Sequence, residues 1–204
     1  MKKVICLIVS VLLIALTVMP SAVASAQIIP SKTTGDMTQI EIKMEDADES
    51  EKNVFFTSSL ADEKAVAISY AQIEKLKEST SVEKYFGEVK DSEGNVVSLA
   101  ELLETEELNC FEFCPVKAGG FEQQEGAATL KMYFVTPYSA GEKVLVLIGF
   151  WPEEDGQPVA DENNIEWIVY EAEVDETGWV VTSIDVQTLL RVQENNALMA
   201  IVSK

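Results

Sequence analysis

The sequence predicts a β-rich α+β protein, in which a small mixed α/β lobe precedes an immunoglobulin-like antiparallel β-sandwich. The first observation is that residues 109–204 contain about six alternating or apolar segments separated by turns, the strand spacing of such a sandwich. The second is that residues 38–108 combine two helical periods with short strand patterns. The third is a hydrophobic content of 47%, which is enough for one sizeable domain or two small ones.

The first 26 residues are expected to be a signal peptide and not part of the fold. Lys2 and Lys3 precede an uncharged apolar run at 4–19, and Ala24-Ser25-Ala26 supplies small residues for cleavage. We place cleavage after Ala26, with cleavage after Ala24 as the alternative. The apolar run is shorter than the roughly 20 residues of a membrane-spanning helix. We therefore expect no transmembrane anchor after cleavage, and a secreted, extracellular or cell-envelope protein.

The first part of the mature chain carries the helices of the predicted lobe. Residues 27–37 lack an apolar period and form a lead-in arm. Within 38–108, apolar residues spaced three and four apart predict a helix at 61–77. Ser98 and Glu101 have the spacing of a capping box, which starts a helix that runs to about 107. The other elements expected here are strands at 40–44 and 54–56, a short helix at 81–86 and a hairpin at 87–97.

The second part, residues 109–204, is expected to form the sandwich. The run at 144–151 is apolar except for Gly149. Such a run belongs in the centre of a sheet covered on both faces, or on the core side of a sandwich with a partly buried outer face. Asp185 is placed to cap a short helix. Further strands are expected at 130–134, 165–174, 179–184 and 197–202.

The charge of the chain excludes several functions. It has 35 acidic and 15 basic residues, a net charge of −20, and loss of two signal-peptide lysines takes the mature chain to 13 − 35 = −22. Nucleic acid is therefore not an expected partner, because phosphate binding needs clustered Lys and Arg, and docking on anionic lipid is disfavoured for the same reason. The absence of histidine removes Ser-His-Asp, Cys-His and His-ligated zinc sites.

The two cysteines of the mature chain, Cys110 and Cys114, allow two interpretations. Four residues of extended strand separate their Cα atoms by roughly 13 Å, whereas a disulfide requires about 4.4–6.8 Å. An oxidising compartment nevertheless favours a bond wherever a tight loop brings cysteines together. In an ordinary strand, both cysteines would share one face with Glu112, and Phe111 and Phe113 would lie on the other. Zinc binding is not favoured, since two further ligands are missing.

Acidic segments are the candidate metal site. Calcium takes six to eight oxygen ligands, and it is the only cofactor that the sequence suggests. The set that we single out is Glu153, Glu154, Asp155, Asp161 and Glu162, with the segment 45–51 as a second acidic cluster. Neither matches a helix-loop-helix calcium motif, and a solvated loop is the ordinary explanation for such a run.

Three tryptophans, Trp151, Trp167 and Trp179, are the candidate ligand-binding residues, since exposed indole rings stack on sugars. Core packing is the common alternative. Trp167 alternates in register with Glu171 and Glu173, which predicts a partly exposed ring, and Trp179 follows a turn across which it can pair.

The precursor resembles an uncharacterised family of small secreted proteins of Gram-positive anaerobic bacteria. The resemblance rests on Ile29 to Met37 after the signal, on Thr136-Pro137-Tyr138 with Gly141-Glu142-Lys143-Val144, and on the hairpin with Trp167 and Trp179. It implies secretion and carries over no catalytic or binding residues.

These observations favour a secreted or cell-envelope binding module without enzymatic activity. Its ligand would be a protein, peptide or glycan outside the cell, bound by loops or an exposed sheet face. No phosphate loop, dinucleotide fingerprint or nucleophile elbow occurs in the sequence. Two alternatives stay open, a hydrolase that uses paired carboxylates and a calcium-stabilised structural domain.

Overall fold

The computed structural model describes residues 37–44, 54–122, 125–134, 138–151, 153–154, 157–158, 164–195 and 197–204. The predicted signal peptide, almost all of the lead-in arm and the acidic segment 45–51 lie outside these residues. Among the helices described, none is long and apolar enough to cross a membrane.

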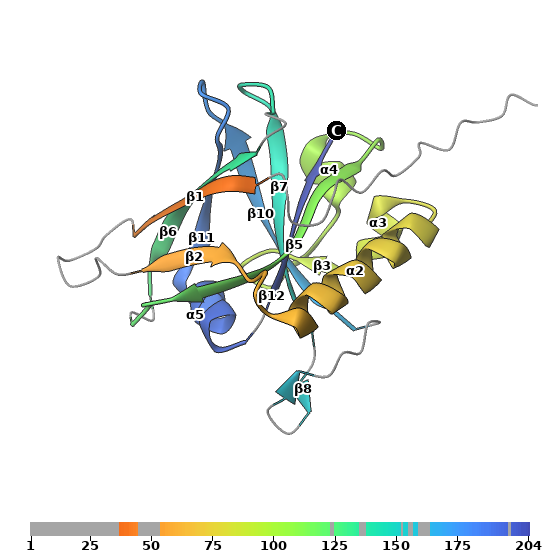
Figure 1. The fold of residues 1–204 in the computed structure, drawn as a ribbon. Helices are drawn as coiled ribbons and strands as arrows, with labels where there is room; N and C mark the ends of the chain where they lie inside the picture. Colours follow the sequence, from red (N-terminus) through yellow and green to blue (C-terminus); the bar gives the residue numbers. More distant parts are fainter. Residues whose placement is uncertain are drawn as a thin grey trace, which may run out of the picture.

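A ten-stranded sheet organises the fold, and its main path runs in the order β1-β6-β11-β10-β7-β12-β5-β2. Neighbours along this path are antiparallel, and the sheet curves until the end strands β1 and β2 contact each other, so that it is nearly a barrel (Figure 1). The strands are β1 (Met37–Met44), β2 (Phe55–Ser58), β3 (Val89–Lys90), β4 (Val96–Val97), β5 (Asn109–Gly119), β6 (Ala127–Phe134), β7 (Lys143–Phe150), β10 (Glu166–Val174), β11 (Val180–Asp185) and β12 (Ala197–Ser203). A separate two-stranded sheet pairs β8 (Glu153–Glu154) with β9 (Gln157–Pro158).

Four described helices accompany the sheet: α2 (Glu63–Glu78), α3 (Val82–Phe86), α4 (Leu99–Leu103) and α5 (Val186–Glu194). Side chains cap all four of them, as small polar residues do at helix N-termini. Ser98 accepts a hydrogen bond from the backbone N of Glu101 at 3.3 Å, and Asp185 accepts one from that of Thr188 at 2.8 Å, so both predicted caps are confirmed. Helix α4 ends earlier than predicted because Glu104 adopts a left-handed conformation, with φ of 55°.

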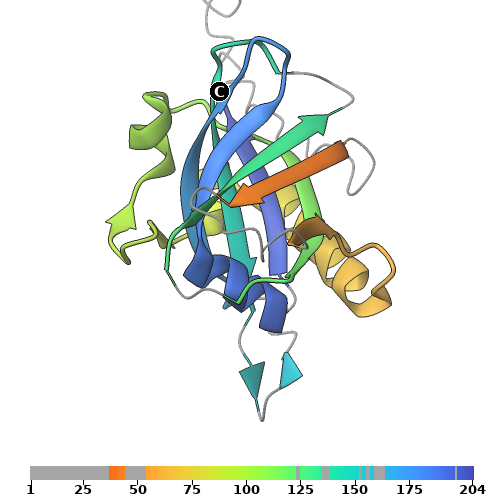
Figure 2. The same cartoon turned by 90° about the vertical axis from the view of Figure 1, so that its left-hand side faces the viewer.

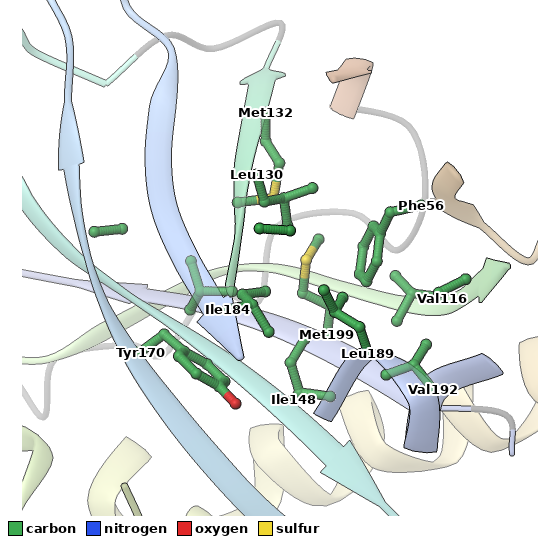
Figure 3. Close-up of a cluster of buried hydrophobic side chains, with 14 of the residues drawn as sticks. Phe56, Val116, Leu130, Met132, Ile148, Tyr170, Ile184, Leu189, Val192 and Met199 are labelled. Carbon is green, nitrogen blue, oxygen red and sulfur yellow. The ribbon is translucent and has the colours of Figure 1, made fainter. Parts of the chain in front are cut away.

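The inner core fills the barrel. Alternate residues of β6 point into it, so that Leu130 and Met132 are fully buried while their neighbours are partly exposed (Figure 3). Helix α5 lies across one end of the barrel and adds Leu189 and Val192 to the same cluster (Figure 2). The hydroxyl of Tyr170 is 2.5 Å from Asp185 Oδ2 and 2.6 Å from Thr188 Oγ1, which ties the start of this helix to β10.

A second, outer core covers half of the barrel. Helices α2, α3 and α4 and the β3–β4 hairpin pack on the outer faces of β5, β12, β7 and β10. Strand β7 lies between both cores, and all its residues from Val144 to Phe150 are buried. Of the two settings predicted for this run, the centre of a sheet covered on both faces is therefore confirmed, and the core side of a sandwich is not.

The β-rich fold is confirmed, with a large antiparallel sheet. The immunoglobulin-like sandwich and the separate N-terminal lobe are not confirmed. Strands β1 and β2, which precede the predicted boundary at residue 108, pair with β6 and β5 of the second part. Since a pattern of alternation reports which residues are buried but not which strands pair, it does not distinguish a sandwich from a closed sheet.

Cys110 and Cys114 lie on opposite faces of β5. Both are buried thiols that are not bonded to each other, Cys110 in the outer core and Cys114 in the inner core. The register between β5 and β12 shifts at this point, where Ile201 pairs with Glu112 and Val202 with Cys110. This bulge inserts one residue and reverses the alternation, so the prediction that both cysteines share a face is wrong.

We therefore expect two thiols in the mature protein. Denaturation followed by iodoacetamide, without a reducing agent, should add two carbamidomethyl groups to each mature chain, as measured by intact mass. Labelling of the folded protein should be slow, because both sulfur atoms are buried. Labelling that requires prior reduction would instead show that the cysteines form a disulfide.

Candidate ligand-binding surface

The outer surface of β6 and β11, together with the adjoining ends of β10 and β7, is not covered by the outer core. We call this surface the outer face. Figure 2 looks onto these strands, and no described helix crosses their middle. The ladder places Lys131 beside Val181, Val181 beside Glu173, and Glu173 beside Lys143. Side chains from four strands therefore form a row across this face, because paired residues point to the same side of a sheet.

A groove of about 360 Å³ lies on the outer face. Hydroxyl, ammonium and carboxylate groups line it, and the lining residues are Thr129, Lys143, Glu171, Ala172, Glu173, Val181, Thr182 and Ser183. Hydroxyls donate and accept hydrogen bonds, ammonium groups donate and carboxylates accept. The groove can therefore bind a ligand that is rich in hydrogen-bond donors and acceptors.

Two aromatic rings lie near the groove on the same face. The ring centroids of Tyr133 and Trp179 are 5.5 Å apart, with an interplanar angle of 50°. A tight turn positions Trp179, because Asp175 Oδ1 accepts hydrogen bonds from the backbone N of Thr177 at 2.8 Å and of Trp179 at 3.1 Å. Gly178 in this turn has a positive φ of 86°, a conformation that favours glycine. We call Tyr133 and Trp179 the aromatic pair.

The charges of the outer face are paired with one another. Lys143 Nζ lies 2.8 Å from Glu171 Oε2, and Lys131 Nζ lies 3.8 Å from Asp175 Oδ2. The hydrogen bond to Glu171 raises the pKa of Lys143. The hydrogen bond from Thr177 is the main reason that the pKa of Asp175 lies below its usual range. Lys131 and Lys143 are therefore each offset by a carboxylate on this face.

Of the three tryptophans predicted to bind a ligand, Trp179 is partly exposed, whereas Trp151 and Trp167 are buried in the outer core. The Trp167 ring packs against Phe86 at 4.8 Å, so the prediction that it is partly exposed is wrong. Trp151 Nε1 is buried and has no hydrogen-bond partner among the described residues. The pairing of Trp179 across its turn is confirmed by the bond of 2.8 Å from the backbone N of Asp175 to the Trp179 carbonyl.

The predicted calcium ligands cannot be compared with the structure. Asp155, Asp161 and Glu162 lie outside the described residues, and for Glu153 and Glu154 only the backbone pairing in β8 is described. Among the described residues, no group of three or more acidic or cysteine side chains is arranged to hold a metal ion.

A second hollow, of about 470 Å³, lies between α5 and the β3–β4 turn. Its charged groups hold α5 against the sheet. Arg191 Nη2 is 2.7 Å from Glu166 Oε2, and its guanidinium lies 3.9 Å from the centre of the Phe150 ring. The bond from Arg191 is the main reason that the pKa of Glu166 is lowered. Because the one basic group among the described residues of the hollow is already held by these contacts, and no aromatic ring is among those residues, we regard the outer face as the better candidate site.

Sequence reasoning did not select most residues of the outer face. The alternation of β6 places Lys131 and Tyr133 on its partly exposed side, so the sequence pattern alone indicates that these two residues share an outer face. Ser183 and Lys143 join them only because β11 and β10 lie between β6 and β7 in the sheet, an order that differs from the order in the chain.

Comparison of the chain with protein-family models, curated proteins and solved structures gives no match. The argument for function therefore rests on the geometry and chemistry of the outer face.

Proposed function

We propose that this chain is a secreted or cell-envelope module without enzymatic activity that binds an extracellular ligand on the outer face. The observation that carries the proposal is the placement of the aromatic pair beside a polar groove on one sheet surface that no described helix covers. Exposed Tyr and Trp supply large contact areas at low entropic cost and are enriched among residues that dominate binding. The basic, apolar and small-residue order of the first 26 residues supports secretion.

The carboxylates of the groove support binding better than hydrolysis. Glu171 and Glu173 are neighbours on one face of β10 and do not oppose each other across a cleft. Glu171 is engaged by Lys143, and 58% of its side chain is exposed. A glycosidase instead places its acid and its base or nucleophile on opposite sides of the scissile bond.

Replacement of Trp179 by alanine should weaken ligand binding about 10- to 30-fold, the effect of losing a residue that contributes roughly 1.4–2 kcal/mol. The measurement is cosedimentation of fluorescently labelled residues 27–204 with envelopes of the cells that produce the protein. Tyr70→Ala is the matched control, because Tyr70 is an aromatic residue on α2 that is 54% exposed and lies away from the outer face. Equal binding by both variants, at the level of the unmodified chain, would contradict the proposal.

A further inference from the structure

We infer that the ligand of the outer face is an uncharged carbohydrate chain. This inference rests on the proposed function and specifies its ligand. The observations that carry it are the charge balance of the face, the chemistry of the groove and the aromatic pair, and the position of the face within the sheet.

The charge of the outer face favours a neutral ligand. The whole chain has a net charge of −20, yet the outer face and the adjoining β1 place three lysines among four acids. These residues are Lys43, Lys131 and Lys143, with Glu41, Glu171, Glu173 and Asp175. Glu41 also lies opposite Lys131 in the ladder. A polyanion would be repelled by the net negative charge of the molecule, and a cationic peptide would meet lysines among the acids of this face, so a neutral ligand fits it best.

The side chains of the groove and the aromatic pair suit the chemistry of a sugar chain. Four residues of β6 separate Thr129 from Tyr133, a length of about 13 Å at the usual rise of a strand. Along this length the face changes from hydroxyl and charged groups in the groove to the rings of the aromatic pair. A sugar ring carries hydroxyls around its edge and C–H groups on its faces. Several linked sugars can therefore stack on the rings at one end and exchange hydrogen bonds with the groove at the other.

The position of the face argues against the other ligand classes. A peptide that binds by strand addition needs a free sheet edge, but β6 pairs with β1 and β11, and β11 pairs with β6 and β10. A protein partner would cover the row that contains Lys131, Glu173 and Lys143, whereas the centres of protein interfaces are depleted of Lys and Glu. The face is therefore suited to a ligand with many hydroxyls that its side chains recognise.

Affinity gel electrophoresis tests this inference. Residues 27–204 are run through native gels that contain an uncharged polysaccharide, namely hydroxyethylcellulose, barley β-glucan, xyloglucan, galactomannan or dextran. Parallel gels contain the anionic polymers alginate, polygalacturonate or heparin. We expect at least one neutral polymer to retard the chain and the anionic polymers not to do so. Trp179→Ala should weaken the retardation at least about tenfold in polymer concentration, and Tyr70→Ala should not change it.

A second measurement is the dependence of the retardation on salt concentration. Retardation by the neutral polymer should stay within about twofold between 0.05 and 0.5 M NaCl, because screening affects charged contacts and not stacking. The inference is overturned if no neutral polymer retards the chain, or if only anionic polymers do. If Trp179→Ala abolishes envelope binding while no neutral polymer binds, the proposed function stands and the carbohydrate inference fails. If the substitution affects neither assay, both fail.

Discussion

Replacement of Gly149 by alanine is expected to lower the free energy of unfolding by about 2–3 kcal/mol, a large loss for the addition of one methyl group. A Cβ atom at this position would lie 2.5 Å from Trp167 Cζ3 and 2.7 Å from two other atoms of the same ring. The ring cannot move aside, because it is 3% exposed and packs edge to face against Phe86 and Phe113. The strand must therefore shift away from the outer core.

Gly119→Ala provides the matched control. A Cβ at Gly119 would also overlap an aromatic ring, that of Phe55, but this ring is 46% exposed and can turn into solvent. Neither glycine has a positive φ, so the backbone accepts alanine at both positions. We expect Gly119→Ala to cost less than about 1 kcal/mol. Urea denaturation followed by far-ultraviolet circular dichroism measures both variants, and equal losses would show that the Trp167 ring is not held in place.

Sequence patterns predicted an element well where its structure depends on residues that are close together in the sequence. The helix expected at 61–77 forms as α2 over Glu63–Glu78, since its period depends on residues close in the sequence. The buried run of β7 was recognisable because an apolar residue at every position needs cover on both faces. Asp185 caps α5 as expected, because the capping bond spans three residues.

Features that depend on distant parts of the chain could not be predicted in this way. Trp167 shares its side of β10 with Glu171 and Glu173, so alternation gives all three the same expected exposure. Only Trp167 is covered, because Phe86 of α3 packs on that end of the strand. The bulge in β5 likewise depends on the partner strand β12, and a shift of one residue reverses the faces of every residue beyond it.

The candidate site was less predictable than the fold for the same reason. Trp179 was selected from its position after a turn, a local signal. Its neighbours in the candidate site come from β6, whose Tyr133 is more than forty residues away in the chain, and from the groove between β10 and β11. A binding face formed by alternate residues of four strands is assembled by the pairing order, which no single strand encodes.

Alkaline pH should destabilise the protein steeply, because Tyr170 is buried and Tyr85 is partly buried against the outer core. Burial is the main reason that the pKa values of Tyr85 and Tyr170 lie well above 10, with Cys110 adding to the effect at Tyr85 and the bond to Asp185 at Tyr170. In the unfolded chain both phenols ionise near pH 10, while in the folded chain they keep their protons. The unfolded state therefore binds fewer protons above pH 10, and stability falls as pH rises from there toward the folded pKa values.

The expected loss is about 1.4 kcal/mol per pH unit for each tyrosine, or about 4 kcal/mol for the pair at pH 11.5. Tyr170→Phe should be about 1 kcal/mol less stable than the unmodified chain at pH 8, since it lacks the hydrogen bonds to Asp185 and Thr188. Relative to the unmodified chain, the variant should gain about 2 kcal/mol by pH 11.5 and so become about 1 kcal/mol more stable, because phenylalanine has no proton to lose. The measurement is a series of urea denaturation curves between pH 8 and 11.5.

Tyr85→Phe should behave in the same way. At neutral pH it should be less stable than the unmodified chain, because it lacks the hydrogen bond of 2.9 Å to Gln72. Above pH 10 it should gain stability relative to the unmodified chain. Tyr70→Phe is the control, because the Tyr70 side chain is 54% exposed and belongs to neither core, and we expect this variant to leave the slope unchanged. Lysines titrate in the same pH range in every variant, so the difference between variants isolates the tyrosines. A slope that neither Tyr85→Phe nor Tyr170→Phe alters would mean that both hydroxyls reach solvent in the folded protein. For Tyr170, it would also mean that the barrel end closed by α5 is open to hydroxide.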